Sequence, residues 1–197
     1  PQRTHDYYSR SKRDAERAVW RAADDGKLNA AALRPGVVYG ERDRTFSNRI
    51  FRSFDAGIFP IIGSGNNHLG VVYAGNVGDA VARAVTCDAT GPFNVASDGY
   101  ISQADFFAIL ASHKRNRVRF VRVPKAAAMA GALTVYWYKK IVRRGRYGGF
   151  PTVAVNFLSG DNPYSCDRAR AQLSWRPSTD PTTAVDRTGA WLRAAER

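Results

Sequence analysis

The fold is decided by the stretch LRPGVVYG at residues 33–40. Residues 28–33 are largely apolar and lie between Gly26 and Pro35, which predicts a short buried strand that ends in a tight turn. Upstream, residues 13–23 are good helix formers with an apolar stripe, and Gly26 is a typical end for that helix. A helix that leads into a buried strand indicates an α/β protein.

The rest of the chain continues this alternation of helices and strands. An amphipathic helix is predicted over residues 46–57, a second helix with Asn76 as its N-cap runs to about residue 88, and residues 102–105 resemble a capping box. Short strands are predicted at residues 61–62, 71–73, 92–95 and 118–123. A chain of 197 residues with 44% hydrophobic residues can bury a core of its own.

Tyr8 and Lys12 are candidate catalytic residues. They stand four residues apart at the start of the predicted helix, so their Cβ atoms lie about 5–6 Å apart on one face. A cation beside a phenol favours the phenolate, which makes tyrosine a usable acid/base near neutral pH. The spacing alone does not identify a site, because Tyr136 and Lys140 repeat it in surroundings that suggest no catalysis.

Four sequence blocks together resemble one protein family. They are YSRSK at residues 8–12, LRPGVVYG at residues 33–40, VVYAGNVGDA at residues 71–80 and YSCDRARAQLSWRP at residues 164–177. In this order they resemble the extended short-chain dehydrogenase/reductases, the NAD-dependent epimerase/dehydratase group, and most closely its hydroxysteroid-dehydrogenase-like branch. The resemblance spans essentially the whole chain.

The resemblance implies a fold and a domain division. The expected fold is the C-terminal part of a Rossmann-type doubly wound parallel sheet plus a smaller α/β substrate-binding subdomain. Residues 1–45 are expected to be the C-terminal portion of the Rossmann domain, with the Tyr-x-x-x-Lys helix. Residues 46–197 are expected to be mainly the substrate-binding subdomain, with residues 70–95 returning to the Rossmann sheet.

The family's first strand, Gly-rich turn and phosphate-binding helix do not precede Tyr8 in this chain, nor does the family's catalytic serine or threonine. Residues 63–65, Gly-Ser-Gly, are no substitute, because a polar turn follows them instead of a helix. We therefore expect the chain to be the C-terminal part of a longer enzyme, inactive alone and a poor binder of NAD(P).

The resemblance also implies roles for particular residues. Tyr8 is the expected general acid/base, while Lys12 binds the nicotinamide ribose and supports the phenolate. Pro35, Gly36, Val37 and Val38 are expected to line the nicotinamide side of the pocket, where glycine allows a close approach to the ring. The expected cofactor is NAD or NADP, and the scattered cysteines and histidines predict no metal site.

The expected substrate class depends on one position at which this sequence differs from the sugar-nucleotide members of the family. Sugar-nucleotide members commonly carry an arginine three residues before the Val-Tyr pair, and Leu69 stands there in this chain. The expected function is therefore an NAD(P)-dependent oxidoreductase acting on a secondary alcohol or carbonyl of an apolar or lipid-like small molecule. The alternatives are a nucleotide-sugar epimerase or dehydratase, for which Arg49 or Arg52 could replace the arginine, and a non-catalytic member that senses cofactor or binds a partner.

The formal net charge of +13 is concentrated in one region. Eleven of the 30 basic residues lie within residues 114–146, and no acidic residue lies between Asp105 and Asp161. Three interpretations stay open: a solvated basic face, a peripheral membrane contact through residues 114–146, and a clamp for an anionic ligand. Nucleic acid is not expected, since the aromatic residues cluster at one helix end instead of interleaving with the arginines.

Location and assembly are predicted only in outline. Cys87 and Cys166 lie far apart in the sequence and indicate no disulfide framework, so the expected location is cytoplasmic. A position at the membrane periphery is the alternative. A homodimer through the Tyr-Lys helix is an open option, in which Val19 and Trp20 would serve, but Trp20 is equally suited to a core.

Overall fold

The computed structural model describes residues 7–142 and 151–196. The strands form three parallel pairs, as expected for an α/β protein. β1 (Ala31–Pro35) pairs with β5 (Gly91–Val95), β2 (Val37–Tyr39) with β4 (Val71–Tyr73), and β3 (Ile58–Ile62) with β6 (Arg119–Val123). Gly36 alone separates β1 from β2, so the chain changes its pairing partner from β5 to β4 at this residue.

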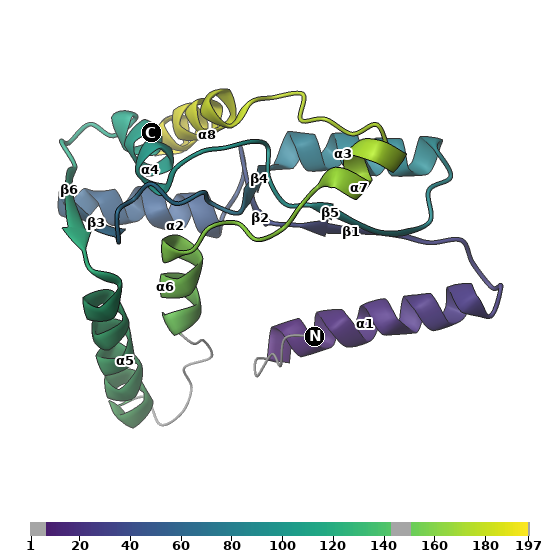
Figure 1. Cartoon of the computed structure of the whole chain (residues 1–197). Helices are drawn as coiled ribbons and strands as arrows, with labels where there is room; N and C mark the ends of the chain where they lie inside the picture. Colours follow the sequence, from purple (N-terminus) through teal and green to yellow (C-terminus); the bar gives the residue numbers. More distant parts are fainter. Residues whose placement is uncertain (1–6, 143–150, 197) are drawn as a thin grey trace.

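Helices lie on both sides of the β1–β5 pair. α1 (Tyr7–Asp24) runs along one side, while α3 (Ala74–Thr86) and the short α7 (Asp167–Gln172) lie on the other (Figure 1). The predicted strand at residues 28–33 begins later, at Ala31, and its residues are exposed or half-buried instead of buried. The physical reason is that strand side chains point to the two faces of a sheet, and α3 packs against β1 whereas α1 makes few contacts with it.

A second group of helices surrounds the β3–β6 end. α2 (Phe46–Ser53) continues into a 3-10 turn (Phe54–Ala56), and α4 (Gln103–Ser112) packs against α8 (Pro181–Ala195). The predicted cap of α4 is confirmed, because the amide of Asp105 donates to Ser102 Oγ at 3.0 Å. Asn76, in contrast, is not the cap of α3, which begins at Ala74.

α5 (Lys125–Val142) and α6 (Pro151–Ser159) form an arm, which projects from the body of the molecule (Figure 1). Among the described residues, no helix is both long enough and apolar enough to cross a bilayer.

Two buried clusters make up the core. The larger joins α2, β4, α4 and α8 and is rich in aromatic rings, among them Phe51, Phe54, Phe106 and Phe107. The smaller lies between β5, α3 and α7 and is centred on Trp175, which is fully buried.

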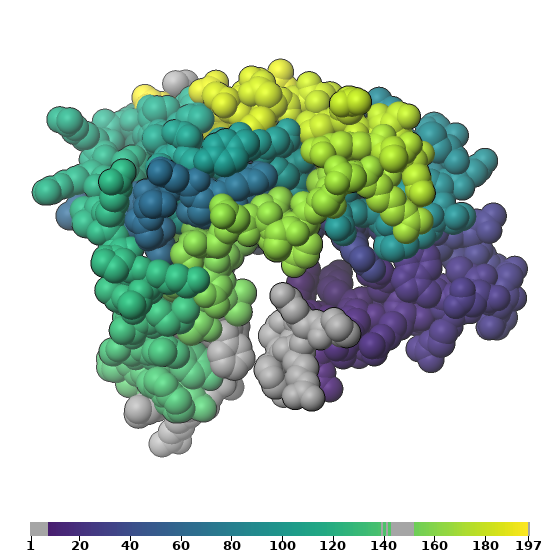
Figure 2. All heavy atoms as spheres, in the orientation of Figure 1, coloured from purple at the N-terminus to yellow at the C-terminus, as the bar shows by residue number. Residues whose placement is uncertain are grey.

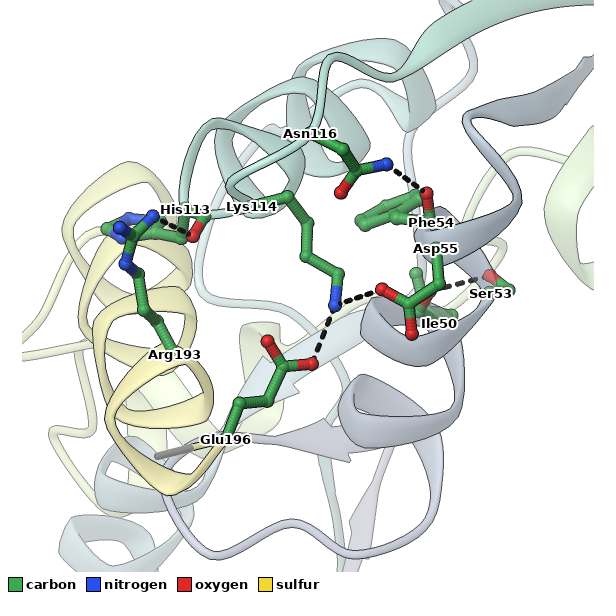
Figure 3. Close-up of polar contacts among 9 residues, drawn as sticks. All are labelled: Ile50, Ser53, Phe54, Asp55, His113, Lys114, Asn116, Arg193 and Glu196. Carbon is green, nitrogen blue, oxygen red and sulfur yellow. Dashed lines mark hydrogen bonds and ion pairs between the residues drawn. The ribbon is translucent and has the colours of Figure 1, made fainter.

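One member of the predicted basic region lies inside the protein. Only 3% of the Lys114 side chain is exposed, and its Nζ lies 2.6 Å from both Asp55 Oδ1 and Glu196 Oε1 (Figure 3). The same nitrogen lies 4.2 Å from the centre of the Phe51 ring. Lys114 is therefore a structural cation that joins the segment after α4 to the 3-10 turn after α2 and to the residue after α8. The interpretation of a solvated basic face does not hold for this residue.

Candidate active site

Tyr8 and Lys12 meet at the start of α1, as their spacing predicts. Lys12 Nζ lies 5.7 Å from the centre of the Tyr8 ring. Tyr8 is 71% exposed, and its carbonyl oxygen accepts a hydrogen bond from Ser11 Oγ at 2.8 Å. The second pair has nearly the same geometry, with Lys140 Nζ 5.9 Å from the Tyr136 ring, so proximity by itself does not separate the two pairs.

Glu16 connects α1 to β1, the strand that ends at Pro35. Its carboxylate forms an ion pair with Arg34 of β1, in which Arg34 Nε donates to Oε2 at 3.2 Å, and it also accepts from Trp20 Nε1 at 3.0 Å. The hydrogen bond from Arg34 lowers the pKa of Glu16 and raises the pKa of the guanidinium. This pair sets the position of the Tyr8–Lys12 helix relative to Pro35.

Gly36 is enclosed by the protein backbone. Its amide donates to the Val95 carbonyl at 3.2 Å, and a Cβ at this position would lie 2.6 Å from Gly70 O and 2.7 Å from Ala96 O. The neighbouring Pro35 and Val38 are exposed. The requirement for glycine thus has a cause within the protein, which is the close approach of two other backbone segments.

Sequence reasoning missed a buried polar group at the ends of the strands. Asp98 Oδ2 accepts from the Tyr73 amide at 2.6 Å and from the Tyr39 hydroxyl at 3.2 Å, and Asp98 Oδ1 accepts from Asn76 Nδ2 at 2.7 Å. Burial raises the pKa of Asp98, although these three hydrogen bonds act against the shift. Burial, followed by the charge of Asp98, raises the pKa of Tyr39.

This group holds together the part of the fold that carries residues 35–38. Tyr39 ends β2, Tyr73 ends β4, and Asp98 lies three residues after β5, so the carboxylate of Asp98 joins the ends of β2 and β4 to the segment after β5. In the sequence, Asp98 stands before Gly99 and looks like an ordinary turn residue, and Asn76 looks like a helix cap. No local pattern identifies either as a buried partner.

The molecule is hollowed between the arm and α1. The space-filling view shows this hollow with α5 and α6 on one side and α1 on the other (Figure 2). Ligands of open parallel α/β sheets bind at the carboxyl ends of the strands, and Pro35 is the carboxyl end of β1. Leu69 points elsewhere: it is fully buried in the larger core cluster.

Comparisons with known proteins bear on the family. The model of the 3-beta hydroxysteroid dehydrogenase/isomerase family matches residues 1–91. The chain is 23% identical to the decarboxylating sterol-4-alpha-carboxylate 3-dehydrogenase of Candida albicans, over 95% of its own length and 56% of that protein. It is 28% identical over 79 residues to the N-acetyl-alpha-D-glucosaminyl-diphospho-ditrans,octacis-undecaprenol 4-epimerase of Escherichia coli O157:H7, which is 39% of this chain and 24% of that protein.

The solved structures agree on the fold. The UDP-glucose 4-epimerase of Thermus thermophilus, in complex with NAD, superimposes with a TM-score of 0.66 at 19% identity, over 99% of this chain and 56% of that one. The chain thus spans about half the length of the Thermus epimerase and about half the length of the Candida dehydrogenase. Together the comparisons confirm the resemblance predicted from the sequence: the chain is similar to extended short-chain dehydrogenase/reductases and has part of the Rossmann-type α/β fold of the solved structure.

Proposed function

We propose that the protein is an NAD(P)-dependent oxidoreductase acting on a secondary alcohol or carbonyl of an apolar, lipid-like small molecule. The observation that carries the proposal is the position of the Tyr8–Lys12 pair: the ammonium lies 5.7 Å from the phenol ring, and the ion pair between Glu16 and Arg34 joins the same helix to β1, which ends at Pro35. A positioned tyrosine hydroxyl can act as a general acid or base, so the pair suits proton transfer at a substrate oxygen.

The roles of the residues follow from this chemistry. Tyr8 gives or takes the proton at the substrate oxygen, and Lys12 binds the nicotinamide ribose. The backbone of residues 35–38 lines the nicotinamide side of the pocket, a role supported by the exposure of Pro35 and Val38 at the end of the sheet. When bound, NAD or NADP supplies or accepts the hydride. Residues 1–45 form the cofactor-facing portion and residues 46–197 mainly the substrate subdomain, with residues 70–95 in the sheet.

The apolar substrate is supported by two observations. The fungal relative is named for a sterol carboxylate, and the bacterial relative for an undecaprenol-linked sugar. Leu69, which stands where sugar-nucleotide enzymes commonly carry an arginine, is buried and leaves that position without a cation.

The second candidate is a nucleotide-sugar epimerase or dehydratase. It is favoured by the structural likeness to UDP-glucose 4-epimerase and by Arg49 and Arg52, which are exposed on α2 and could meet a diphosphate. Thermal unfolding in the presence of NAD separates the candidates. Protection by UDP-glucose or a dTDP-sugar, with none by a 3β-hydroxysteroid, would favour the epimerase.

The Tyr8→Phe variant tests the proposal. In the longest natural form of the protein, with NAD or NADP and a 3β-hydroxysteroid, we expect the rate of nicotinamide reduction to fall by about 100-fold or more. Tyr136→Phe is the matched control, because Tyr136 has a lysine at the same spacing and nearly the same distance. We expect it to leave the rate unchanged.

The outcome also separates catalysis from sensing. If Tyr8→Phe turns over as fast as the wild type, or no more slowly than Tyr136→Phe, the assigned role is wrong. A non-catalytic member would show no turnover in either form while still binding the cofactor, which isothermal titration calorimetry measures directly.

A further inference from the structure

The outer face of α5 carries large apolar side chains that the rest of the described structure leaves uncovered. α6 packs against one face of α5, where the half-buried residues of the helix lie, namely Ala128, Met129, Ala132 and Tyr136. The remaining surface exposes Trp137 and Tyr138, which are 54% and 66% accessible. Three aliphatic residues are exposed beside them: Leu133, Val135 and Val142. These five exposed residues are called the arm surface.

The arm surface does not belong to the candidate active site. In Figure 1, α6 lies on the side of α5 that faces α1, so the hollow between the arm and α1 is on the α6 side. The helix that carries the arm surface lies on the opposite side of this hollow from α1 (Figure 2). A cluster of two aromatic and three aliphatic side chains exposed on one helix is unusual for a protein surface and indicates a contact with another apolar phase.

Cations lie at both ends of α5 and in the segment before it. Lys140 Nζ lies 4.8 Å from the Trp137 ring, and Lys125 is exposed at the other end of α5. Four arginines are exposed before the helix: Arg115, Arg117, Arg119 and Arg122. Among the residues that the structure describes, none of these six cations has an ion-pair partner. Arg143, Arg144 and Arg146 lie outside the described residues.

We propose that the arm surface binds to the interface of an anionic phospholipid bilayer. Tryptophan and tyrosine combine an apolar body with a polar tip and are favoured at the level of the lipid headgroups. A helix with such residues on its open face and Lys and Arg at its flanks suits an anionic interface, in which aliphatic side chains enter the acyl boundary and the cations meet the headgroups.

Charge makes the other occupants less suitable. A second copy of the chain would bring together two regions that contain basic residues and no acidic ones, because residues 106–160 carry no Asp or Glu. A nucleic acid would match the charge, but exposed aliphatic side chains offer no stacking partner for bases. An anionic membrane satisfies both the apolar and the basic part of the surface.

Co-sedimentation with vesicles tests the proposal. We expect the protein to bind vesicles that contain phosphatidylglycerol and phosphatidylcholine, and to bind pure phosphatidylcholine at least about tenfold more weakly. The double variant Trp137→Ser, Tyr138→Ser should lose about tenfold or more in affinity for the anionic vesicles. Tyr164→Ser is the matched control, because Tyr164 is similarly exposed but lies before α7, outside the arm.

Single charge substitutions provide an independent test if the double variant folds poorly. Lys125→Gln and Lys140→Gln should each weaken binding to anionic vesicles about fivefold, whereas Arg83→Gln on α3 should have no effect. Absence of vesicle binding, equal binding to both lipids, or wild-type binding by the arm variants would overturn the proposal. So would a dimer, seen by sedimentation velocity without lipid, that the double variant abolishes.

Discussion

Asn76 Nδ2 donates a hydrogen bond to Asp98 Oδ1 at 2.7 Å inside the protein. The same nitrogen donates to the Thr179 carbonyl at 2.8 Å, while Asn76 Oδ1 accepts from the amides of Ser178 and Thr179, each at 3.0 Å. A single buried carboxamide therefore joins the first turn of α3, the end of β5 and the segment that leads into α8.

Replacing Asn76 by alanine should be strongly destabilising. The change removes hydrogen bonds to two distant segments and leaves Asp98 Oδ1 and the amides of Ser178 and Thr179 without the bonds that Asn76 makes to them. Because a buried group left unsatisfied costs about 1–3 kcal/mol, we expect Asn76→Ala to lower the free energy of unfolding by about 3 kcal/mol. Urea denaturation followed by circular dichroism measures this change. Asn94→Ala is the control: Asn94 Nδ2 donates to the Ser165 carbonyl at the surface, and its loss should cost less than about 1 kcal/mol.

The buried Lys114 gives a second prediction, which depends on pH. Burial alone lowers the pKa of Lys114, but hydrogen bonds to Asp55 and Glu196 outweigh it, so the pKa lies above that of an ordinary lysine. The ion pairs therefore stabilise the fold fully below about pH 10.4, the ordinary lysine value, and this contribution is lost as the pH rises through the folded pKa. We expect Lys114→Met to lower the free energy of unfolding by about 2 kcal/mol near neutral pH. As the pH rises through the folded pKa of Lys114, the difference in stability between the variant and the wild type should become smaller.

The control for Lys114 is an ion pair at the surface. Arg170 Nη1 lies 3.0 Å from Asp167 Oδ1 within one exposed helical turn, and Arg170→Met should change the stability by less than about 0.5 kcal/mol. If both methionine variants melt like the wild type, the buried cation contributes nothing and the interpretation of Figure 3 is wrong.

Relations within one helix or turn could be predicted from the sequence, and remote ones could not. The closeness of Tyr8 and Lys12 and the Ser102–Asp105 cap depend on spacings of four and three residues, so local geometry determines them. Lys114 and Glu196 are separated by 82 positions. No periodicity connects such positions, so Lys114 resembled a surface charge until the fold brought its partners together.

The same distinction applies within the candidate site. The residues of the Pro-Gly turn could be found from the sequence, but the reason for Gly36 could not, because Gly70 and Ala96 approach it from two other segments. Asp98 was missed because an Asp-Gly pair is common in exposed turns, whereas here the carboxylate is buried and accepts a hydrogen bond from Asn76 of α3.

Asp43 gives a prediction at the start of α2. Its Oδ1 accepts from the Thr45 amide at 2.8 Å and its Oδ2 from the Ser47 amide at 2.6 Å, so it satisfies amides that the helix leaves open. Burial acts to raise the pKa of Asp43, but the hydrogen bonds from Ser47 and Thr45 outweigh it and lower the pKa. Its contribution is therefore present above about pH 3.9 and is lost as the pH falls through the folded pKa.

We expect Asp43→Ala to lower the free energy of unfolding by about 1–2 kcal/mol at neutral pH. Asp43→Asn is the control, because asparagine caps helices about as well as aspartate and should retain most of the stability. Thermal melts of both variants from neutral pH down to about pH 3 check the prediction. An alanine variant that keeps a constant deficit at all these pH values would contradict the assigned role of the carboxylate.

Gly36 and Gly78 should respond to alanine in opposite directions. At Gly36 the added Cβ would lie 2.6 Å from Gly70 O and 2.7 Å from Ala96 O, and both are backbone atoms that can move only with their strands. We expect Gly36→Ala to destabilise the protein by about 3 kcal/mol. Gly78 lies within α3, and no atom of another described segment comes within 4 Å of the point where its Cβ would lie, so Gly78→Ala should stabilise by about 0.5–1 kcal/mol through helix propensity.

Urea denaturation of the two glycine variants in parallel measures their free energies of unfolding, which should differ by about 4 kcal/mol. Gly36→Ala should lie below the wild type and Gly78→Ala above it. The comparison isolates packing from backbone entropy, because both substitutions restrict the unfolded chain in the same way. A Gly36→Ala variant as stable as Gly78→Ala would mean that β2 can move away from Gly70 and Ala96 at little cost. The turn that carries residues 35–38 would then be adjustable, and the fixed nicotinamide-facing backbone proposed for it would have to be abandoned.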